Sequence, residues 1–184
     1  MKRIDTALAG VCILEPTVHG DGRGFFLESY NRKAFADLDI HDEFVQDNHS
    51  RSRGGVLRGL HFQVQQAQSK LVRVLRGEVF DVAIDVRRDS AQFGQWFAVT
   101  LSEDEPRMLY IPKGFAHGFY VISDMAEFTY KVDDFYAPEH ERGIIWNDPD
   151  IDITWPPGCT NPVLSDRDAA HGRFADLEES DLPV

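Results

Sequence analysis

Two histidines occupy positions where an imidazole could carry acid–base chemistry. His61 occurs in the stretch GVLRGLHFQ and His117 in IPKGFAHGF, so glycines and apolar residues surround both. Such surroundings indicate partial burial, and a buried imidazole must either be hydrogen-bonded or act on a ligand. The structural alternative for each is a hydrogen-bonded core histidine. The other histidines lie in polar stretches, and we expect them at the surface: His19, His41, His49, His140 and His171.

A tyrosine and a lysine are directed toward the interior by the alternation of a β-strand. Tyr130 shares a strand face with Phe128, and Lys70 shares one with Val72. A buried phenol needs a polar partner or a chemical task, and a buried ammonium needs a compensating negative charge. The alternatives are a core tyrosine bonded to the backbone and a strand-end lysine that reaches solvent.

The charge pattern predicts a local site for a small anion. The chain has 19 basic and 31 acidic residues, a net charge of −12, which argues against nucleic acid and anionic membranes as partners. Residues 48–77 nevertheless contain no Asp or Glu, whereas the last twenty residues are strongly acidic. A basic outer face of a strand pair is the alternative to an anion pocket. The basic residues of this window are Arg51, Arg53, Arg58, Lys70, Arg73 and Arg76.

Length and composition predict a single globular domain. With 184 residues, 42% of them hydrophobic, the chain can bury a core without disulfides, and it is too apolar to be disordered. Its two cysteines, Cys12 and Cys159, are far apart and suit buried thiols in a reducing compartment. No targeting or membrane-spanning segment is evident, and residues 7–14 are expected to form an opening strand.

The elements that must position these residues are mostly short strands. Apolar residues alternate over 79–86, and further β-rich runs cover 71–75, 96–101, 107–111, 119–122 and 127–132. Hairpin turns are expected at 76–78 and at 123–124, with short helices over 32–38 and 174–180 and a rigid turn at 155–158. Strands at this spacing indicate a mainly β sandwich or barrel.

Two sequence elements resemble those of the cupin superfamily. Residues 112–117 match the Pro-x-Gly-x-x-His element, and Gly55 followed by His61 resembles the other. In metal-binding cupins the latter element supplies His-x-His and then Glu. Gln63 replaces the second histidine here, and Lys70 lies near the place of the glutamate. Because a lysine would repel a divalent cation, we predict a cupin scaffold that holds no metal.

A longer series of motifs resembles one enzyme family over about residues 5–170. The series is DGRGFFLE (21–28), QDNHS (46–50), LRGLHFQ (57–63), KLV (70–72), IPKGFAHGF (111–119), YK (130–131), WNDP (146–149) and LSDRD (164–168). In this order and spacing it is similar to the dTDP-4-dehydrorhamnose 3,5-epimerases of the dTDP-L-rhamnose pathway, which serves cell-surface polysaccharide. The resemblance implies a jelly-roll barrel with extra N-terminal strands and short peripheral helices. It also implies one domain over 1–184, with a C-terminal arm from about 157.

The resemblance implies a reaction through an enolate. The family inverts C3 and C5 of a dTDP-linked 4-keto-6-deoxyhexose, and both carbons flank the C4 ketone. By position in the motifs, His61 is the base, Asp168 its carboxylate partner and Tyr130 the proton donor. Lys70 is expected to stabilise the enolate oxygen. No cofactor is implied.

The resemblance also assigns the residues that bind the nucleotide sugar. Arg23 and Arg58 are expected at the diphosphate, and Phe26 and Tyr136 at the two faces of thymine. Arg58 and His61 would face opposite sides of a regular strand. Either a bulge at Gly59 removes this conflict, or Arg58 serves a different part of the site. The remaining expected contacts are Glu28, Gln46, Asp47, Asn48, Gln63, His117, Glu141 and Arg167.

Family membership implies a cytoplasmic homodimer in which strands cross between subunits and some ligand contacts come from the neighbouring chain. Three alternatives stay open. The first is an epimerase that inverts only C3 or only C5 of a related sugar. The second is a metal-dependent cupin oxygenase, against which Gln63 and Lys70 speak. The third is a non-catalytic cupin that binds nucleotide sugars, for which a general acid and base would be unnecessary.

Overall fold

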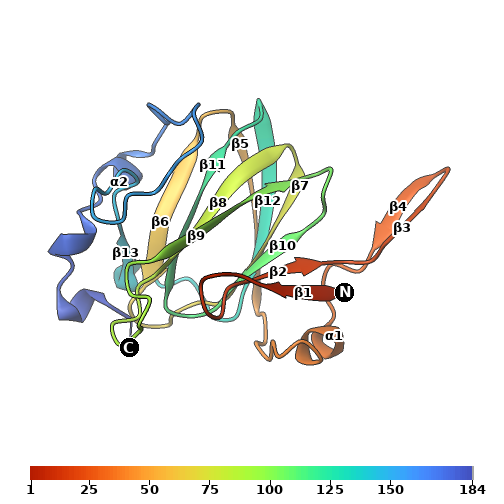
Figure 1. Ribbon diagram of the computed structural model, residues 1–184, viewed down its shortest axis with the longest axis horizontal. Helices are drawn as coiled ribbons and strands as arrows, with labels where there is room; N and C mark the ends of the chain where they lie inside the picture. Colours follow the sequence, from red (N-terminus) through yellow and green to blue (C-terminus); the bar gives the residue numbers. More distant parts are fainter. Residues whose placement is uncertain (184) are drawn as a thin grey trace.

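The computed structural model describes residues 1–183 and consists mainly of two antiparallel sheets that face each other (Figure 1). The six-stranded sheet has the order β1 (Lys2–Asp5), β2 (Cys12–Glu15), β10 (Met108–Ile111), β7 (Lys70–Arg76), β12 (Met125–Val132) and β5 (Gln46–Arg53). The five-stranded sheet has the order β13 (Glu141–Gly143), β6 (Leu57–Gln63), β11 (Phe115–Val121), β8 (Glu78–Asp85) and β9 (Trp96–Ser102). The mainly β jelly-roll prediction is confirmed.

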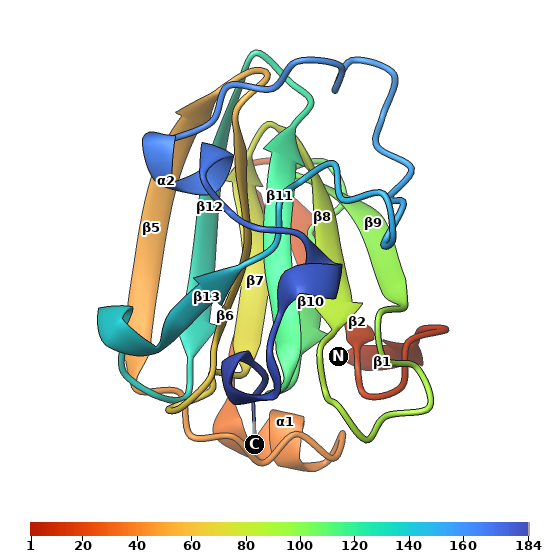
Figure 2. The same ribbon diagram turned by 90° about the vertical axis from the view of Figure 1, so that its left-hand side faces the viewer.

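The main core lies between the two sheets and follows from strand alternation. Val72 and Val74 of β7 and Phe128 of β12 pack in one buried cluster with Val79 of β8 and Phe119 of β11. The outer face of β8 is also apolar, and the C-terminal segment covers it. In Figure 2 this segment lies across the five-stranded sheet. Residues on both faces of β8 are therefore buried.

Both predicted hairpins are wrong. β7 and β8 are joined at Gly77 but belong to different sheets, and so do β11 and β12, joined at residues 122–124. Each short connection carries the chain from one sheet to the other. Gly77 permits this with φ of +76° and with Met125 O only 2.1 Å from where a Cβ would lie. A jelly roll pairs strands that are distant in sequence, which local turn signals do not report.

The opening strand expected over residues 7–14 is also different. Two strands, β1 and β2, pair with each other on either side of a turn, and β2 continues the sheet beside β10. The Thr6 hydroxyl donates a hydrogen bond of 2.8 Å to the Val11 carbonyl and closes the turn, in which Gly10 has φ of +98°. These strands are the predicted N-terminal additions to the barrel.

A bulge in β6 confirms the expectation at Gly59. His61 lies opposite His117 and Arg58 opposite Phe119, so residues 59 and 60 face one residue, Gly118, of β11. A Cβ on Gly59 would lie 2.5 Å from the Gly118 Cα, and its φ is +131°. The bulge allows both Arg58 and His61 to line the same cavity.

A two-stranded hairpin, β3 (Val18–Asp21) and β4 (Gly24–Leu27), extends away from both sheets (Figure 1). We call residues 18–27 the arm, which is distinct from the C-terminal segment that begins at about residue 157. Phe25 and Phe26 on the arm are 65% and 70% exposed, which is unusual for large apolar side chains. Within residues 1–183, Phe25 and Phe26 are therefore left largely uncovered.

The helices are short and peripheral. They are α1 (Arg32–Ala36), α2 (Asp166–Ala169) and the 3-10 turns η1 (Pro138–His140), η2 (Phe174–Asp176) and η3 (Glu179–Asp181). The helix expected over 32–38 is present, whereas the one expected over 174–180 is resolved into two separate turns. Both cysteines are buried free thiols, as predicted. Among residues 1–183, none of the helices has the length and apolar character needed to cross a membrane.

Candidate active site

A cavity of about 410 Å³ lies between the two sheets and receives side chains from both. The wall on the six-stranded sheet comes from β5, β7 and β12, and the opposite wall from β6 and β11. β13 and the start of α2 close one side. The lining includes the predicted residues Gln46, Asn48, Arg58, His61, Gln63, Lys70, His117, Tyr130, Tyr136, Glu141, Arg167 and Asp168.

His61 and Asp168 form a hydrogen-bonded pair at the cavity wall, although they are 107 residues apart in sequence. Nε2 of His61 is 2.5 Å from Oδ1 of Asp168. An ionised carboxylate can only accept, so Nε2 carries the proton that is donated, and Nδ1 is left as the proton-accepting nitrogen. Nδ1 lies 3.8 Å from Oε1 of Glu141. This arrangement is suited to general-base chemistry.

The start of α2 holds the Asp168 carboxylate in place. Ser165 caps the helix by accepting a hydrogen bond from the Asp168 amide, and its hydroxyl donates to Asp168 Oδ2 at 2.8 Å. Burial would raise the pKa of Asp168, but the imidazoles of His171 and His61 and the Ser165 hydroxyl hold it well below its usual range. Asp168 is therefore charged throughout the neutral range.

His171 is not at the surface, contrary to expectation. Its side chain is 12% exposed, and its Nε2 lies 3.6 Å from Oδ1 of Asp168. The polar composition around residue 171 concealed this burial. The C-terminal segment folds back so that the His171 ring lies against Gly143 of β13, and Ile145, just after that strand, donates to the Gly172 carbonyl at 2.9 Å. The three-residue spacing from Asp168 at the end of a short helix was the one available signal.

Lys70 is buried at the start of β7 and lines the cavity, as its strand parity predicted. Burial lowers its pKa to about 8, although the charges of Glu141 and Asp133 act in the opposite direction. Of these two carboxylates, Asp133 is paired with Lys113 and Glu141 with Arg167 rather than with Lys70. An anionic group of a ligand in the cavity would supply a negative partner.

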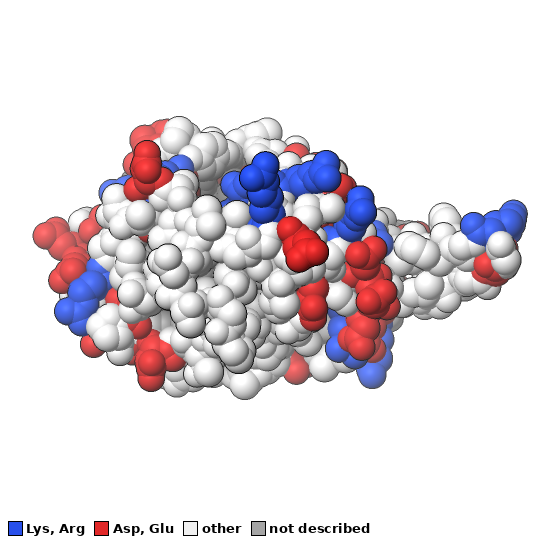
Figure 3. All heavy atoms as spheres, turned by 90° about the horizontal axis from the view of Figure 1, so that it is seen from above, with Lys and Arg blue, Asp and Glu red and all other residues white. Residues whose placement is uncertain are grey.

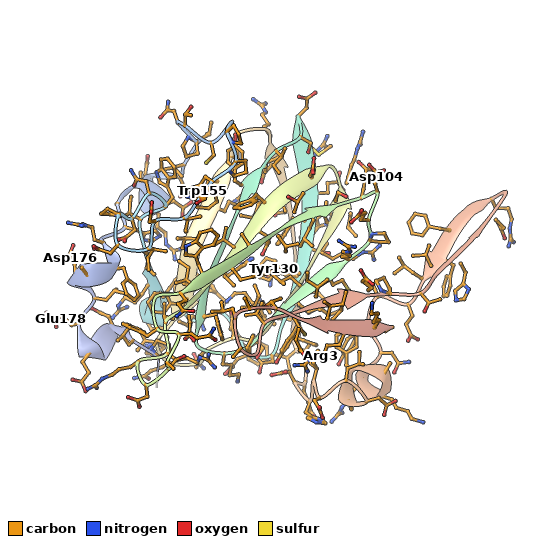
Figure 4. All side chains as sticks on the ribbon, in the orientation of Figure 1. Arg3, Asp104, Tyr130, Trp155, Asp176 and Glu178 are labelled. Atoms are coloured by element: carbon orange, nitrogen blue, oxygen red, sulfur yellow. The ribbon has the colours of Figure 1, made fainter. Side chains whose placement is uncertain are left out.

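Tyr130 enters the cavity from β12, on the wall opposite to that of His61. In Figure 4 Tyr130 is labelled near the middle of the molecule. Burial, and then the charge of Glu141, raise the pKa of Tyr130. The phenol therefore remains protonated at neutral pH and can act as a hydrogen-bond or proton donor.

His117 lies beside His61 in register and is bonded on its far side. Its Nε2 is 2.9 Å from Oδ1 of the fully buried Asp81, whose pKa is raised by burial and lowered in part by His117. The ring packs on Phe128, with centroids 6.2 Å apart. His117 is thereby held in one orientation at the cavity wall.

A polar cluster forms the open side of the cavity. The Tyr136 hydroxyl donates to Glu141 Oε2 at 2.6 Å, and Arg167 pairs with the same carboxylate and donates to the Tyr136 oxygen at 3.1 Å. Burial would raise the pKa of Glu141, but Arg167, Tyr136 and His61 lower it overall. Tyr136 is 49% exposed, so its ring is accessible to a planar group.

The remaining polar residues of the lining already make hydrogen bonds within the protein, some to backbone and some to other side chains. Gln63 is bonded to backbone, since it accepts from the Ala137 amide at 2.9 Å and donates to the Gln66 carbonyl at 2.6 Å. Gln46 donates to Asn48 at 2.9 Å, and Arg58 donates to the Ser52 hydroxyl at 3.0 Å. Arg58 and Lys70 give the cavity positive charge.

Four of the expected binding residues lie away from the cavity. Arg23 and Phe26 are on the arm, and Glu28 follows it and accepts a hydrogen bond from Asn31. Asp47 lies on the outer face of β5, where Lys131 pairs with it at 2.8 Å. In Figure 3 the arm extends to one side of the body, which contains the cavity. Within the described chain, none of these residues lines the cavity that contains His61.

The residues do not fit a metal ion. Gln63 and Lys70 occupy the expected ligand positions, and Lys70 contributes a cation to the cavity. In the described part of the chain, His61, Asp168 and His171 do present donor atoms within 4.8 Å of one another. The His61–Asp168 separation of 2.5 Å, however, is a hydrogen bond, whereas two ligands of one tetrahedral ion lie about 3.4 Å apart.

Comparison with known proteins gives a consistent result. The family described as dTDP-4-dehydrorhamnose 3,5-epimerase matches residues 5–176. A dTDP-4-dehydrorhamnose 3,5-epimerase of Pseudomonas aeruginosa is 56% identical over 179 residues, which cover 97% of this chain and 98% of that protein.

Two solved structures are similar along almost the whole chain. The dTDP-6-deoxy-D-glucose-3,5-epimerase of Legionella pneumophila, in complex with dTDP-4-keto-L-rhamnose, is 52% identical with a TM-score of 0.96 and covers 99% of this chain and 97% of its own. A 3'-monoepimerase of Streptomyces bikiniensis, in complex with dTDP-quinovose, is 32% identical with a TM-score of 0.91 and covers 97% and 91%.

Proposed function

This chain belongs to the dTDP-4-dehydrorhamnose 3,5-epimerase family, and we propose that it inverts C3 and C5 of dTDP-4-dehydro-6-deoxy-D-glucose to give dTDP-4-dehydro-L-rhamnose. The observation that carries the proposal is the placement of a base and an acid on opposing walls of one cavity. His61 comes from the five-stranded sheet and Tyr130 from the six-stranded sheet. Inversion of a carbon needs proton removal on one face and proton delivery on the other.

The proposed first step is removal of a proton next to the C4 ketone. His61 Nδ1 takes the proton from C3 or C5, and the C–H electron pair moves into an enolate whose charge rests on the C4 oxygen. The Asp168 carboxylate stabilises the imidazolium that forms. Lys70 donates to the enolate oxygen, which would provide a negative partner for its buried ammonium, since Asp133 and Glu141 pair with other cations.

The second step returns a proton to the opposite face of the same carbon. The Tyr130 hydroxyl donates it, and the resulting phenolate recovers a proton from solvent while His61 releases the one it holds. The raised pKa of Tyr130 suits a donor to a strongly basic enolate carbon. The same cycle at the second carbon completes the conversion without a cofactor.

The nucleotide is proposed to bind along the polar side of the cavity. Arg58 would bind the diphosphate and Tyr136 one face of thymine, with Gln46, Asn48 and Arg167 around them. The arm supports a homodimer, because Arg23 and Phe26 can join a nucleotide site only in a neighbouring subunit. A cytoplasmic location and a role in supplying rhamnose for cell-surface polysaccharide belong to the same proposal.

Proton NMR in D₂O tests the function directly. The substrate dTDP-4-dehydro-6-deoxy-D-glucose is incubated with the purified protein, with and without a chelator. We expect deuterium at both C3 and C5 at the same rate in both samples, and none with His61→Asn, which should still bind dTDP. Exchange at one carbon only would favour a single-centre epimerase such as the Streptomyces bikiniensis relative. Absence of exchange with wild-type protein would overturn the proposal.

A further inference from the structure

The carboxylate of Asp168 is flanked by two imidazoles rather than one. His171 Nε2 lies 3.6 Å from Asp168 Oδ1, the same oxygen that is 2.5 Å from His61 Nε2. The two rings meet edge to face, with centroids 5.3 Å apart and planes at 75°. The other carboxylate oxygen is held by Ser165. Oδ1 is therefore hydrogen-bonded to His61 and has His171 Nε2 as a second close neighbour.

His171 Nε2 is a buried polar atom with no hydrogen-bond partner within bonding distance among residues 1–183. A buried donor without an acceptor is costly, and the structure offers this atom a charged acceptor just beyond hydrogen-bond length. A small ring displacement toward Asp168 satisfies both groups. This orphaned atom indicates a function for His171 that packing alone does not explain.

The surrounding backbone is shaped to admit the His171 ring. Gly143 lies opposite His61 in the register of β13 and β6, and a Cβ on Gly143 would be 2.3 Å from the His171 Cε1. The next residue, Gly172, accepts a hydrogen bond of 2.9 Å from the Ile145 amide. The ring thus packs against the Gly143 backbone, and the adjoining backbone at Gly172 is anchored by a hydrogen bond.

We propose that His171 is a positioning residue of the epimerase: its Nε2–H donates to Asp168 Oδ1, fixes the carboxylate and moderates the basicity that Asp168 confers on His61. The inference rests on the proposed role of His61 as the base. A second donor on the shared oxygen withdraws negative charge from the His61 contact. Protonated His61 then gives up its proton more readily and is ready for the next abstraction at lower pH.

Other ionisable groups also face the two imidazoles, and these groups are the same in the wild type and in the position-171 variants. Glu141 on β13 lies 3.8 Å from His61 Nδ1 and is paired with Arg167 of α2, and Lys70 on β7 lines the same cavity. His117 on β11 lies opposite His61 in register. The cavity is also lined by Arg58, Tyr130 and Tyr136. A substitution at position 171 changes none of these groups. A shift in pH dependence upon that substitution can therefore be attributed to the shared carboxylate.

The test compares two variants that differ in whether a hydrogen-bond donor remains at position 171. His171→Phe keeps a ring but removes the donor, whereas His171→Gln retains an amide N–H at a similar reach. For His171→Phe we expect the acidic limb of the kcat/KM profile to move about half to one pH unit toward higher pH. The rate at pH 6 then falls about three- to tenfold, while KM for substrate changes little. His171→Gln should restore the wild-type limb, and His41→Phe, at an exposed histidine, should not move it.

A measurement on the unmodified protein makes the inference independent of variant folding. Long-range ¹H–¹⁵N NMR of the histidine rings identifies which nitrogen carries the proton. We expect His171 to be protonated on Nε2 through the neutral range. A proton on Nδ1 alone, or a His171→Phe profile that superimposes on the wild type, would overturn the inference. Deuterium exchange by the wild type would still stand in that case, so the two failures are distinguishable.

Discussion

At the scale of single residues, the chemistry depends on how burial changes the pKa values of side chains in the cavity wall. Lys70 is buried in the cavity wall and Tyr130 is partly buried there, and in both cases burial disfavours the charged form of the side chain. It makes the ammonium easier to deprotonate and the phenol harder to deprotonate. Near neutral pH the same cavity therefore contains a cation and a proton donor.

The lowered pKa of Lys70 predicts a basic limit to activity. The ammonium is charged below a pKa of about 8 and neutral above it, so stabilisation of the enolate oxygen is lost as pH rises through that value. The pKa of Tyr130 is raised, so Tyr130 does not titrate first. We expect kcat to fall above about pH 8. In Lys70→Arg, whose charge persists, this limb should disappear from a profile measured between pH 6 and 10.

Lys70→Gln tests the same assignment at fixed pH. We expect kcat to drop about 10²- to 10³-fold with little change in dTDP affinity, because the ammonium acts on charge that develops during the reaction. Steady-state kinetics and calorimetric titration with dTDP provide the two numbers. Equal losses in both would show that Lys70 serves binding instead.

Tyr130→Phe removes one hydroxyl and separates the two proton transfers. We expect substrate protons to exchange with D₂O through His61, while formation of the inverted product falls about 10²- to 10⁴-fold. NMR of the sugar follows exchange and configuration in the same sample. Normal inversion by this variant would make Tyr130 a structural residue of the cavity wall.

At the scale of elements, the bulge in β6 determines which side chains reach the cavity. It places Arg58 and His61 on the same side of a strand in which a three-residue spacing would otherwise separate them. The bulge depends on a close approach between two glycines of neighbouring strands. The position of the base is therefore linked to the stability of this strand pair.

Gly59→Ala should be strongly destabilising. The added Cβ would lie 2.5 Å from the Gly118 backbone, in a conformation with φ of +131° that alanine rarely adopts. We expect a loss of about 3 kcal/mol in the free energy of unfolding, measured by urea denaturation. Gly22→Ala in the arm is the matched control, because nothing lies within 4 Å of its Cβ. Equal stability of the two variants would contradict this account of the bulge.

At the scale of the whole molecule, the residues proposed to bind the nucleotide lie in two separate places on one chain, the arm and the cavity. Arg23 and Phe26 extend away from the body that contains His61 and Lys70 (Figure 1). Basic side chains also gather on the upper end of the body in Figure 3, apart from the arm. A dimer in which each arm reaches the other subunit would reunite the two parts.

Mixing two inactive variants tests this exchange. Arg23→Ala combined with Phe26→Ala impairs the arm, and His61→Asn impairs the cavity. If arms act on the neighbouring subunit, a statistical mixture refolded together contains about a quarter of its sites with an intact cavity and an intact arm. We expect activity to recover toward that fraction. Activity no higher than that of the separate variants would mean that each chain builds its own site.

Sequence alone determined the strand faces and the chemical types at the site. Alternation directed Lys70 and Tyr130 inward, and the glycine in LRGLHFQ correctly indicated a bulge, because strand parity is a local property of the backbone. The motif series then supplied Asp168, which no local pattern would have selected from an acidic tail.

Only the tertiary structure decided which strands are neighbours and which distant residues meet. The expected hairpins proved to be crossings between sheets, since strand pairing in a jelly roll is non-local. The contact of His171 with Asp168 depends on a C-terminal segment folding back onto β13, and the distance of the arm from the cavity depends on the course of the whole chain. These contacts join residues that are distant in sequence, so they depend on long-range packing and cannot be predicted from local residue preferences.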